Sequence, residues 1–226
     1  MKRWDSYKWG AEIKMEYIEN NQNATIVLDI IEEIHKNAAY LSEIDGATGD
    51  GDHGINMNKG FMLAKERINL EMSISEAFKI LGRTLVMDIG GSMGPIYGTM
   101  FSAFSKKLQT EKIYPEILLE ALEAATVQLL ELAGAKIGDK TLLDTIYPAQ
   151  ESYKEALNRN ENYGKALQAL ADGAEAGKEN TKKLTAKIGR AARLGERSKG
   201  YLDAGATSCS IILQTMVHSM QQKIVK

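Results

Sequence analysis

Three aspartates stand close together in the segment IDGATGDGDHGIN, separated only by small residues. Asp45, Asp50 and Asp52 fall within eight residues, and each pair of carboxylates ~4 Å apart costs roughly 1 kcal/mol even in water. Carboxylate oxygens are the ligands that Mg2+ and Ca2+ prefer, so the cluster predicts a site for a hard cation. The EF-hand is excluded, because the closing glutamate position, counted from Asp45 or Asp50, holds Asn56 or Phe61. A solvated turn with helix-capping aspartates remains the alternative.

A second glycine-rich segment, GGSMGPIYGTMF, has the pattern of a tight turn that leads into a helix. Pro95 suits the first turn of that helix, and backbone N–H groups at a helix start bind phosphate oxygens. Three carboxylates also suit two metal ions shared with a polyphosphate better than they suit one hydrated Mg2+. The Rossmann fingerprint is excluded, because no strand precedes the turn and the glycine spacing differs. An ordinary turn between packed helices stays open as the other interpretation.

The segment GDKTLLD is similar to a P-loop but lacks its glycine–lysine step, since Asp139 separates Gly138 from Lys140. Asp139 is more simply interpreted as a helix N-cap, and Lys140 or Thr141 can still face a ligand. Further along the chain, seven Lys and Arg residues fall between Lys182 and Lys199. The glycines in and after that segment indicate a mobile flap that places Arg190 over an anion, with a solvated surface as the alternative.

Composition limits the class of protein. The 226 residues are 44% hydrophobic and 26% charged, which is enough apolar material for a substantial core. With 28 basic against 30 acidic residues, nothing indicates a nucleic-acid or membrane partner. No apolar run is long enough to span a bilayer, and the basic start lacks the apolar stretch of a signal peptide. The single Cys209 excludes an intramolecular disulfide. From these observations together we expect a soluble, cytoplasmic protein.

Apolar residues recur at helical spacing in residues 27–41, 74–85, 118–132 and 209–220. Ser73 and Glu76 form a capping box before the second stripe, and Pro115 suits the first turn of the third. No convincing strand alternation appears. The pattern predicts one all-α domain, a bundle of about eight antiparallel helices. The glycines gather between helical segments, at residues 46–60, 90–98, 134–138 and 189–205, and we expect these connections to converge at one end.

The remaining histidines and the cysteine attract no functional hypothesis. His35 is interpreted as a surface residue, His218 lies in the last predicted helix, and Cys209 belongs to an apolar stripe and is expected in the core. His53 differs because it adjoins the aspartates, although capping the following helix is its alternative role.

Taken in order, four segments resemble the nucleotide-binding L subunit of bacterial dihydroxyacetone kinase, the DhaL family. They are GDGDHGINMNKGF, GGSMGPIYGTMF, GAKIGDKTLLD and GRAARLGERSKGYLDAGATS. The resemblance implies a closed barrel of eight antiparallel helices, with a nucleotide, ADP or ATP, and two Mg2+ ions bound in the loops at one end. Residues 1–20 are expected to be an N-terminal extension and residues 21–226 the DhaL-like nucleotide-binding domain.

The resemblance also assigns residues to the site. It implies that Asp45, Asp50 and Asp52 are the metal ligands. The implied nucleotide-binding residues are those at the family's contact positions: His53, Gly54, Ile55, Asn56, Ser92, Met93, Ala133, Leu142, Arg190, Asp203, Ala204 and Gly205.

By the same resemblance, the chain is a kinase subunit that is active only with a partner. In the family, a K-type subunit holds the ketose covalently through a histidine, and an M-type phosphotransferase subunit recharges the bound nucleotide in one form of the system. Phosphoryl transfer mostly needs positioning and charge neutralisation, so a site without its own nucleophile is sufficient. No catalytic residue is therefore assigned beyond the metal and nucleotide ligands Asp45, Asp50, Asp52 and Arg190.

The chain departs from the family pattern in the second, third and fourth segments. Met93 replaces a small residue, Ala204 replaces a proline, and Ala133 and Gly134 replace a common glycine and lysine. These differences keep two alternatives open. One is a nucleotide-sensing regulatory adaptor with little turnover, and the other is a phosphoryl donor for a different acceptor.

Overall fold

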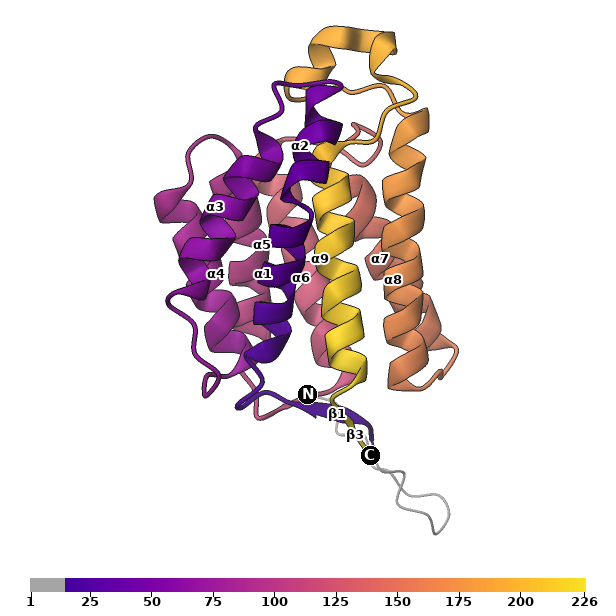
Figure 1. Cartoon of the computed structure of the whole chain (residues 1–226). Helices are drawn as coiled ribbons and strands as arrows, with labels where there is room; N and C mark the ends of the chain where they lie inside the picture. The colour runs from indigo at the N-terminus through magenta and orange to yellow at the C-terminus, as the bar shows by residue number, and fades with distance from the viewer. Residues whose placement is uncertain (1–14) are drawn as a thin grey trace.

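The computed structural model describes residues 15–226 and shows a ring of antiparallel helices (Figure 1). Within these residues the α-helices are α1 Thr25–Lys36, α2 Ala38–Gly46, α3 His53–Lys65, α4 Ile74–Asp88, α5 Met93–Lys107, α6 Pro115–Ala133, α7 Leu143–Asn158, α8 Tyr163–Asn180 and α9 Ala204–Gln221. Two 3-10 helices, η1 Thr181–Lys183 and η2 Arg190–Ser198, lie between α8 and α9. Helix α9 packs against both α8 and α1, which closes the ring. The expected all-α class is confirmed.

The first predicted helix is divided into two. Its apolar stripe runs over residues 27–41, but the backbone leaves helical geometry at Asn37, where φ is −94° and ψ is 6°. The Asn37 side-chain amide donates to the Glu33 carbonyl at 2.8 Å and so satisfies the end of α1. Helix α2 therefore begins as a separate helix, and Asp45 lies in its last turn.

Capping signals that are visible in the sequence fix several helix ends. The Ser73 hydroxyl accepts from the Glu76 N–H at 3.2 Å, and the Glu76 carboxylate accepts from the Ser73 N–H at 2.9 Å. Helix α6 begins at Pro115, and it ends at Gly134, whose φ of +58° suits a residue without Cβ. These positions confirm the capping box and the first-turn proline.

Four fully buried phenylalanines form the aromatic part of the core: Phe61, Phe78, Phe101 and Phe104. Their ring centroids lie between 5.6 and 6.5 Å apart, within the range of favourable aromatic pairs. Cys209 is fully buried on the inner face of α9, as its apolar stripe predicts, and burial raises the pKa of its thiol.

A small antiparallel sheet, which the sequence pattern did not predict, covers one end of the ring (Figure 1). Strand β1 Tyr17–Glu19 lies between β2 Lys112–Ile113 and β3 Ile224–Val225, with Ile18 opposite both Ile113 and Ile224. Strands of two or three residues are too short to display the alternation by which strands are recognised.

Asn20, directly after β1, ties this sheet end to the helices. Its side chain is buried, and the amide nitrogen donates to the Ser75 hydroxyl, the Leu108 carbonyl and the Thr110 carbonyl at 3.1, 2.9 and 2.8 Å. The amide oxygen accepts from the Ser75 N–H at 3.1 Å. One neutral side chain thus satisfies polar groups from α4 and from the connection after α5.

The proposed division into an extension, residues 1–20, and a domain, residues 21–226, stays a prediction. Residues 1–14 lie outside the described residues. Residues 17–19 form β1, in which Ile18 is fully buried, so the folded body includes the last part of the expected extension. In the described part of the chain, no helix has the combination of length and apolar character needed to cross a membrane.

The opposite end of the ring carries the connections α2–α3, α4–α5, α6–α7 and α8–α9 (Figure 1). Within residues 15–226, the glycines with positive φ all lie in these connections: Gly51, Gly91, Gly134, Gly138, Gly189, Gly195 and Gly200. The glycine distribution therefore predicts correctly that distant segments meet at one end, which we call the site end.

Candidate metal and nucleotide site

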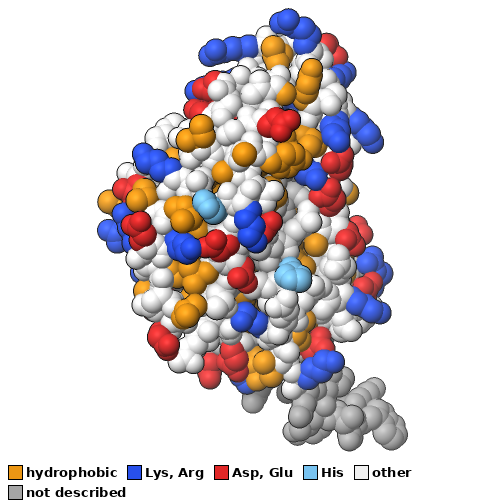
Figure 2. All heavy atoms as spheres, viewed as in Figure 1, with side chains coloured by type: hydrophobic (Ala, Val, Ile, Leu, Met, Phe, Trp, Pro, Cys, Tyr) orange, Lys and Arg blue, Asp and Glu red, His pale blue; other side chains and the backbone are white. Residues whose placement is uncertain are grey.

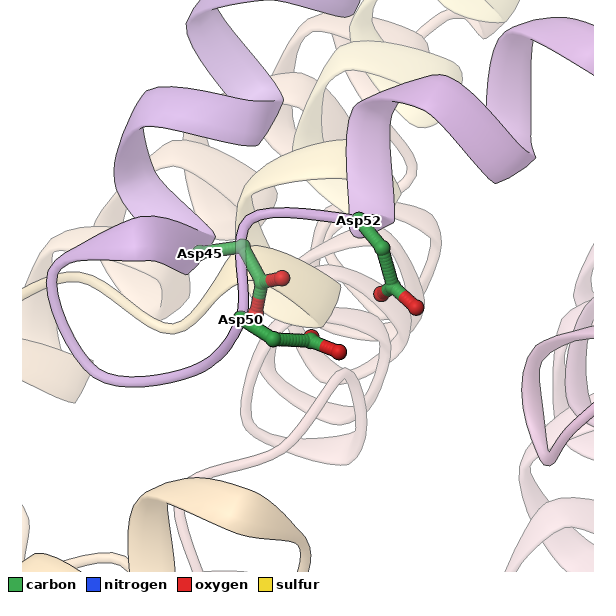
Figure 3. Close-up of side chains that lie close together, drawn as sticks. All are labelled: Asp45, Asp50 and Asp52. Carbon is green, nitrogen blue, oxygen red and sulfur yellow. The ribbon is translucent and has the colours of Figure 1, made fainter.

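The three aspartates meet at the site end, in and beside the connection from α2 to α3 (Figure 3). Asp45 lies in the last turn of α2, Asp50 in the connection, and Asp52 immediately before α3. One carboxylate oxygen from each lies within 4.8 Å of the others. Oxygen-only donors at this spacing match the preference of a hard divalent cation, so the donor set fits Mg2+.

Local backbone geometry gathers these carboxylates. Gly51 has a φ of +76°, which turns the chain between Asp50 and Asp52. A Cβ on Gly49 would lie 2.5 Å from a carboxylate oxygen of Asp45, so only glycine lets the chain pass that close. The other Asp45 oxygen accepts from the His53 N–H at 3.3 Å, which anchors the carboxylate to the start of α3.

Arg190 provides the cation that faces the aspartates. It begins η2, forms an ion pair with Asp50, and lies 3.9 Å from Asp52 through its second terminal nitrogen. Figure 2 shows basic side chains at the same end of the molecule, over the segment between α8 and α9. The Arg190 side chain is 56% exposed, and ion pairs that exposed are weak. A metal ion or a phosphate group can therefore replace either partner at small cost.

Hydrogen bonds join the first turns of three helices beside the aspartates. The His53 Nε2 of α3 lies 2.8 Å from the Ser208 hydroxyl of α9, which lies 2.5 Å from the Tyr97 hydroxyl of α5. Tyr97 also donates to the Gly205 carbonyl at 3.1 Å. Surrounding protein atoms desolvate His53 and lower its pKa to about 4, although Asp45 opposes the shift. His53 is thus a neutral connector at pH 7 and not the N-cap that we considered, which is Asp52.

Sequence reasoning missed Tyr97 and Ser208. Tyr97 stands inside the segment GGSMGPIYGTMF, for which the sequence predicts only a turn that leads into a helix. Burial raises the pKa of its phenol, so Tyr97 acts as a neutral hydroxyl. The one sequence signal was that each residue carries a hydroxyl and stands a few positions after a glycine-rich helix start.

The predicted residues at the start of α3 differ in what they offer. A Cβ on Gly54 would lie 1.9 Å from the Ala38 carbonyl, so this glycine allows α3 to pack against α2. The Ile55 side chain is 66% exposed, and Asn56 is partly exposed. Because the first N–H groups of a helix have no intrahelical partner, the backbone of Gly54 and Ile55 is the donor available to an anion.

Ser92 and Met93 mark the start of α5. The Ser92 side chain makes no capping hydrogen bond, and the Met93 side chain packs against the hydrophobic core. A Cβ on Gly90 or Gly91 would meet no atom within 4 Å, so the turn before α5 borders open space. This turn can therefore present its N–H groups to a ligand irrespective of the Met93 side chain.

The segment between α6 and α7 corrects one interpretation. Helix α7 begins at Leu143, so Asp139 is not its N-cap, and the Asp139 carboxylate accepts from the Lys136 N–H at 2.7 Å. No side chain caps α7; Asp144 in its first turn instead holds the preceding connection, because its two carboxylate oxygens accept from the Gly138 and Thr141 N–H groups at 2.5 and 2.8 Å. Spacing alone could not distinguish the two aspartates of GDKTLLD.

Leu142, Ala133 and the start of α9 occupy the same end. Leu142 is buried, and a Cβ on Gly205 would lie 3.6 Å from its backbone nitrogen. Ala133 is the last residue of α6. Asp203 caps α9 through a hydrogen bond from the Ala206 N–H at 2.7 Å, and Ala204 is buried beside it. Burial raises the pKa of Asp203 to about 6, although the Ala206 N–H and Lys140 oppose the shift.

Some of the predicted residues are linked by contacts, whereas others only lie at the same end of the barrel. The aspartates contact Arg190, and His53 reaches Gly205 through Ser208. Gly205 lies against Leu142. Three further residues belong to this group only because they lie at helix ends on the same side of the ring: Ser92, Met93 and Ala133.

A hollow of about 640 Å³ opens nearby, between α7, α8 and η1. Ile137, Tyr147, Gly177 and Lys183 are among the residues that line it. The lining includes none of the predicted metal or nucleotide residues. This hollow therefore does not redefine the site.

Comparison with known proteins is consistent with these observations. The DAK2 domain family matches residues 47–218. The ADP-binding subunit DhaL of PEP-dependent dihydroxyacetone kinase 1 from Listeria innocua is 35% identical over 193 residues, which cover 84% of this chain and 92% of that protein. The chain belongs to the DhaL family. A second DhaL, the ADP-binding subunit of the PEP-dependent dihydroxyacetone kinase of Escherichia coli, is 34% identical over 180 residues, 78% of this chain and 86% of that protein.

A solved structure supports the fold of this DhaL-family chain. The dihydroxyacetone kinase from C. freundii, in complex with AMP-PNP and Mg2+, superposes with a TM-score of 0.66 at 24% sequence identity. The match covers 97% of this chain but only 37% of that chain. The likeness therefore shows that the helical barrel is shared, and that the matched region is about a third of the longer protein.

Proposed function

We propose that this chain is the ADP- and ATP-binding, Mg2+-dependent subunit of a dihydroxyacetone-type kinase. The observation that carries the proposal is the aspartate cluster, whose oxygens lie within 4.8 Å of one another at the end where glycine-rich helix starts meet. Membership of the DhaL family, whose relatives are named ADP-binding subunits, agrees with this chemistry.

Asp45, Asp50 and Asp52 are the proposed metal ligands, and three carboxylates suit two Mg2+ ions shared with a polyphosphate. When bound, Mg2+ supplies positive charge that neutralises the phosphate oxygens and fixes their orientation. The protein's own contribution is to hold the carboxylates in place, through the Gly51 turn and the His53 N–H. It also supplies Arg190, a cation at the same site.

The nucleotide is proposed to lie across the helix starts at the site end. Backbone N–H groups around Ser92 and at the beginning of α3 face solvent there and suit phosphate oxygens. Arg190 suits the same phosphates because a guanidinium binds anions through paired N–H donors. The first turn of α9 and Leu142 supply the adjoining buried surface.

The acceptor is proposed to come from a partner chain. The described site contains metal-type carboxylates and donors but no nucleophile–base pair, and phosphoryl transfer by positioning needs none. A K-type subunit that holds dihydroxyacetone is the proposed partner, with an M-type phosphotransferase subunit as the source of phosphoryl groups. The relatives' names, as subunits of PEP-dependent dihydroxyacetone kinases, support this assignment.

Calorimetric titration with ADP, with and without Mg2+, tests the site. Asp50→Ala should reduce ADP affinity about hundredfold in Mg2+ and remove most of the dependence on the metal, because one ligand carboxylate is lost. Asp172→Ala is the matched control, since Asp172 is exposed on α8 and contacts only Gln168. If Asp50→Ala bound ADP as tightly as the control, with the same Mg2+ dependence, the proposed metal site would be wrong.

Turnover tests the acceptor separately. The purified chain, mixed with Mg2+, ATP and a K-type subunit carrying dihydroxyacetone, should form dihydroxyacetone phosphate. A parallel reaction with an M-type system and phosphoenolpyruvate identifies the donor. Tight ADP binding with no product in any pairing would support a regulatory adaptor and contradict the kinase assignment.

A further inference from the structure

Lys140 is a buried charged residue to which the proposed function gives no role. Its residue is only 2% exposed, although lysine is seldom buried without a partner. The ammonium group donates to three backbone carbonyls, those of Leu184, Ser198 and Tyr201, at 3.3, 2.5 and 2.8 Å. All three belong to the segment of residues 184–201, which we call the flap. Lys140 therefore does not face a ligand, contrary to one of the options that its sequence left open.

These contacts use the full donor capacity of the ammonium. A lysine has three N–H donors and no acceptor, so each proton has one carbonyl partner. In the described residues Lys140 forms no ion pair, and burial lowers its pKa while Asp203 opposes that shift. The Lys140 backbone also has a φ of +64°, a conformation that residues other than glycine rarely adopt. A strained backbone and a desolvated charge at one residue both need compensation by the carbonyls that it binds.

Several backbone hydrogen bonds fix the base of the flap. Two internal hydrogen bonds close the base, from the Gly200 N–H to the Lys182 carbonyl at 2.8 Å and from the Ala186 N–H to the Ser198 hydroxyl at 2.9 Å. The Lys187 N–H donates to the Asp139 carbonyl at 3.0 Å. Lys140 lies where both ends of the flap meet, since Leu184 enters it and Ser198 and Tyr201 leave it.

Arg190 projects from this flap toward the aspartates. The segment before it turns at Gly189, where φ is +74°, and η2 is interrupted at Gly195, where φ is +54°. A Cβ on either glycine would meet no atom within 4 Å, so both turns of the flap border open space. The place of Arg190 over Asp50 therefore depends on how firmly the base is fixed.

We propose that Lys140 is a positioning residue, which fixes the base of the flap through three carbonyls and so holds Arg190 at the metal and nucleotide site. It acts through Arg190 and does not itself contact phosphate. The effect on nucleotide rests on the proposed function, whereas the effect on the flap does not. These two consequences can be measured separately.

Flap mobility is measured first, without any ligand. An arginine-specific protease cleaves after Arg190, Arg193 and Arg197, so loss of a lysine does not change its sites. Lys140→Met should accelerate cleavage of the ligand-free chain at these arginines about tenfold, because three flap carbonyls lose the ammonium donor that joins them. Lys182→Met is the control, since Lys182 is exposed and pairs only with Glu179. Circular dichroism establishes that each variant is folded.

Lys140→Gln is the second variant. Glutamine lacks the charge but keeps two N–H donors, so it can still bind some of the carbonyls that methionine leaves without a donor. Its cleavage rate should lie between those of the wild type and Lys140→Met. Unchanged cleavage in either folded variant would overturn the proposal, whatever the chain binds.

A double-variant comparison then tests the route of action. Lys140→Met should weaken ADP binding in Mg2+ about tenfold in the wild-type background but less than about twofold when Arg190 is already glutamine. Equal losses in both backgrounds would show that Lys140 acts on the nucleotide directly, and the proposal would fail. If the wild type bound no ADP at all, the proposed function would fail, while the cleavage result would still decide the role of Lys140.

Discussion

The two ends of the barrel differ in how their polar groups are paired. At the sheet end, Asn20 satisfies four partners with one neutral amide, and three short strands pair their backbones. At the site end, polar groups include Asp45, Asp50 and Asp52, the buried Lys140, and a flap that carries Arg190. The first end is satisfied by the chain alone. The second combines the buried Lys140, which backbone carbonyls hold in place, with exposed ion pairs that a ligand can exchange.

This contrast assigns stability and binding to different regions. Exposed ion pairs such as that between Arg190 and Asp50 contribute little to folding, so the site end can exchange them for a ligand. A buried and fully hydrogen-bonded amide such as Asn20 cannot be exchanged without cost. Substitution of Asn20 should therefore change stability, whereas substitution of the exposed charges at the site end should mainly change ligand binding.

The largest effect is expected at the sheet end. Asn20→Ala should lower the free energy of unfolding by about 4 kcal/mol, because buried carbonyls and one N–H lose their partners. Asn23→Ala is the control, since the Asn23 amide makes only one hydrogen bond, to the Glu19 carbonyl, and should cost about 1 kcal/mol. Urea unfolding measures both. ADP affinity of folded Asn20→Ala should equal that of the wild type, and a loss there would contradict the independence of the two ends.

The next largest effect separates two kinds of glycine at the site end. Gly54→Ala should cost about 3 kcal/mol, because the new Cβ would lie 1.9 Å from the Ala38 carbonyl. Gly90→Ala should change stability by less than about 0.5 kcal/mol, since its Cβ would meet no atom within 4 Å. Thermal unfolding of both variants gives the comparison. Equal losses would mean that the glycines serve backbone conformation alone and not the packing of α3 on α2.

The third effect is a pH dependence confined to the site end. The folded pKa of Asp203 is raised from 3.8 to about 6, so its contribution to stability grows as the pH falls from 6.5 to 4.5. The folded pKa of His53 is lowered from 6.5 to about 4, so its contribution falls over the same interval. Each change amounts to about 2 kcal/mol, and the two oppose each other.

Single variants should uncover these opposing terms. Relative to the wild type, Asp203→Asn should lose about 2 kcal/mol of stability on acidification from pH 6.5 to 4.5, and His53→Gln should gain a similar amount. Urea unfolding at several pH values, each referred to the wild type at the same pH, measures the difference. Parallel profiles for all three proteins would show that neither group titrates in this interval in the folded chain.

The ease of predicting the two ends from sequence also differs. Helical stripes, the Ser73 capping box and Pro115 are local signals, so the helices and several of their ends were predictable. The sheet was not, because strands of two or three residues carry no pattern. The break at Asn37 was missed because apolar spacing continues across it.

At the site end, residue type and density were enough to predict that the carboxylates of Asp45, Asp50 and Asp52 gather, since these residues are neighbours in sequence. Contacts over long sequence distances were not predictable. The pair His53 and Ser208 spans 155 positions, and Lys140 meets Tyr201 across 61. The sequence shows that Lys140 follows a glycine-rich turn, but only the fold shows that carbonyls and not phosphate occupy its N–H donors.

The smallest effect concerns Met93, which stands where the family pattern has a small residue. Its side chain packs against the core, while Gly91 and Ser92 before it are exposed and no side chain caps the start of α5. Met93→Ser should therefore cost about 1 kcal/mol of stability, from lost apolar burial, and change ADP affinity by less than about twofold. Met87→Ser is the control, since Met87 is 68% exposed at the end of α4 and should alter neither quantity.

Calorimetry and urea unfolding on the same samples decide between side-chain and backbone recognition at this turn. A gain in ADP affinity of about tenfold for Met93→Ser would show that a hydroxyl at this position binds phosphate. The wild-type chain would then have exchanged a ligand contact for core packing, and the separation between stability and binding would fail at this residue. Unchanged affinity with reduced stability would instead extend the separation to a residue that lies within the site itself.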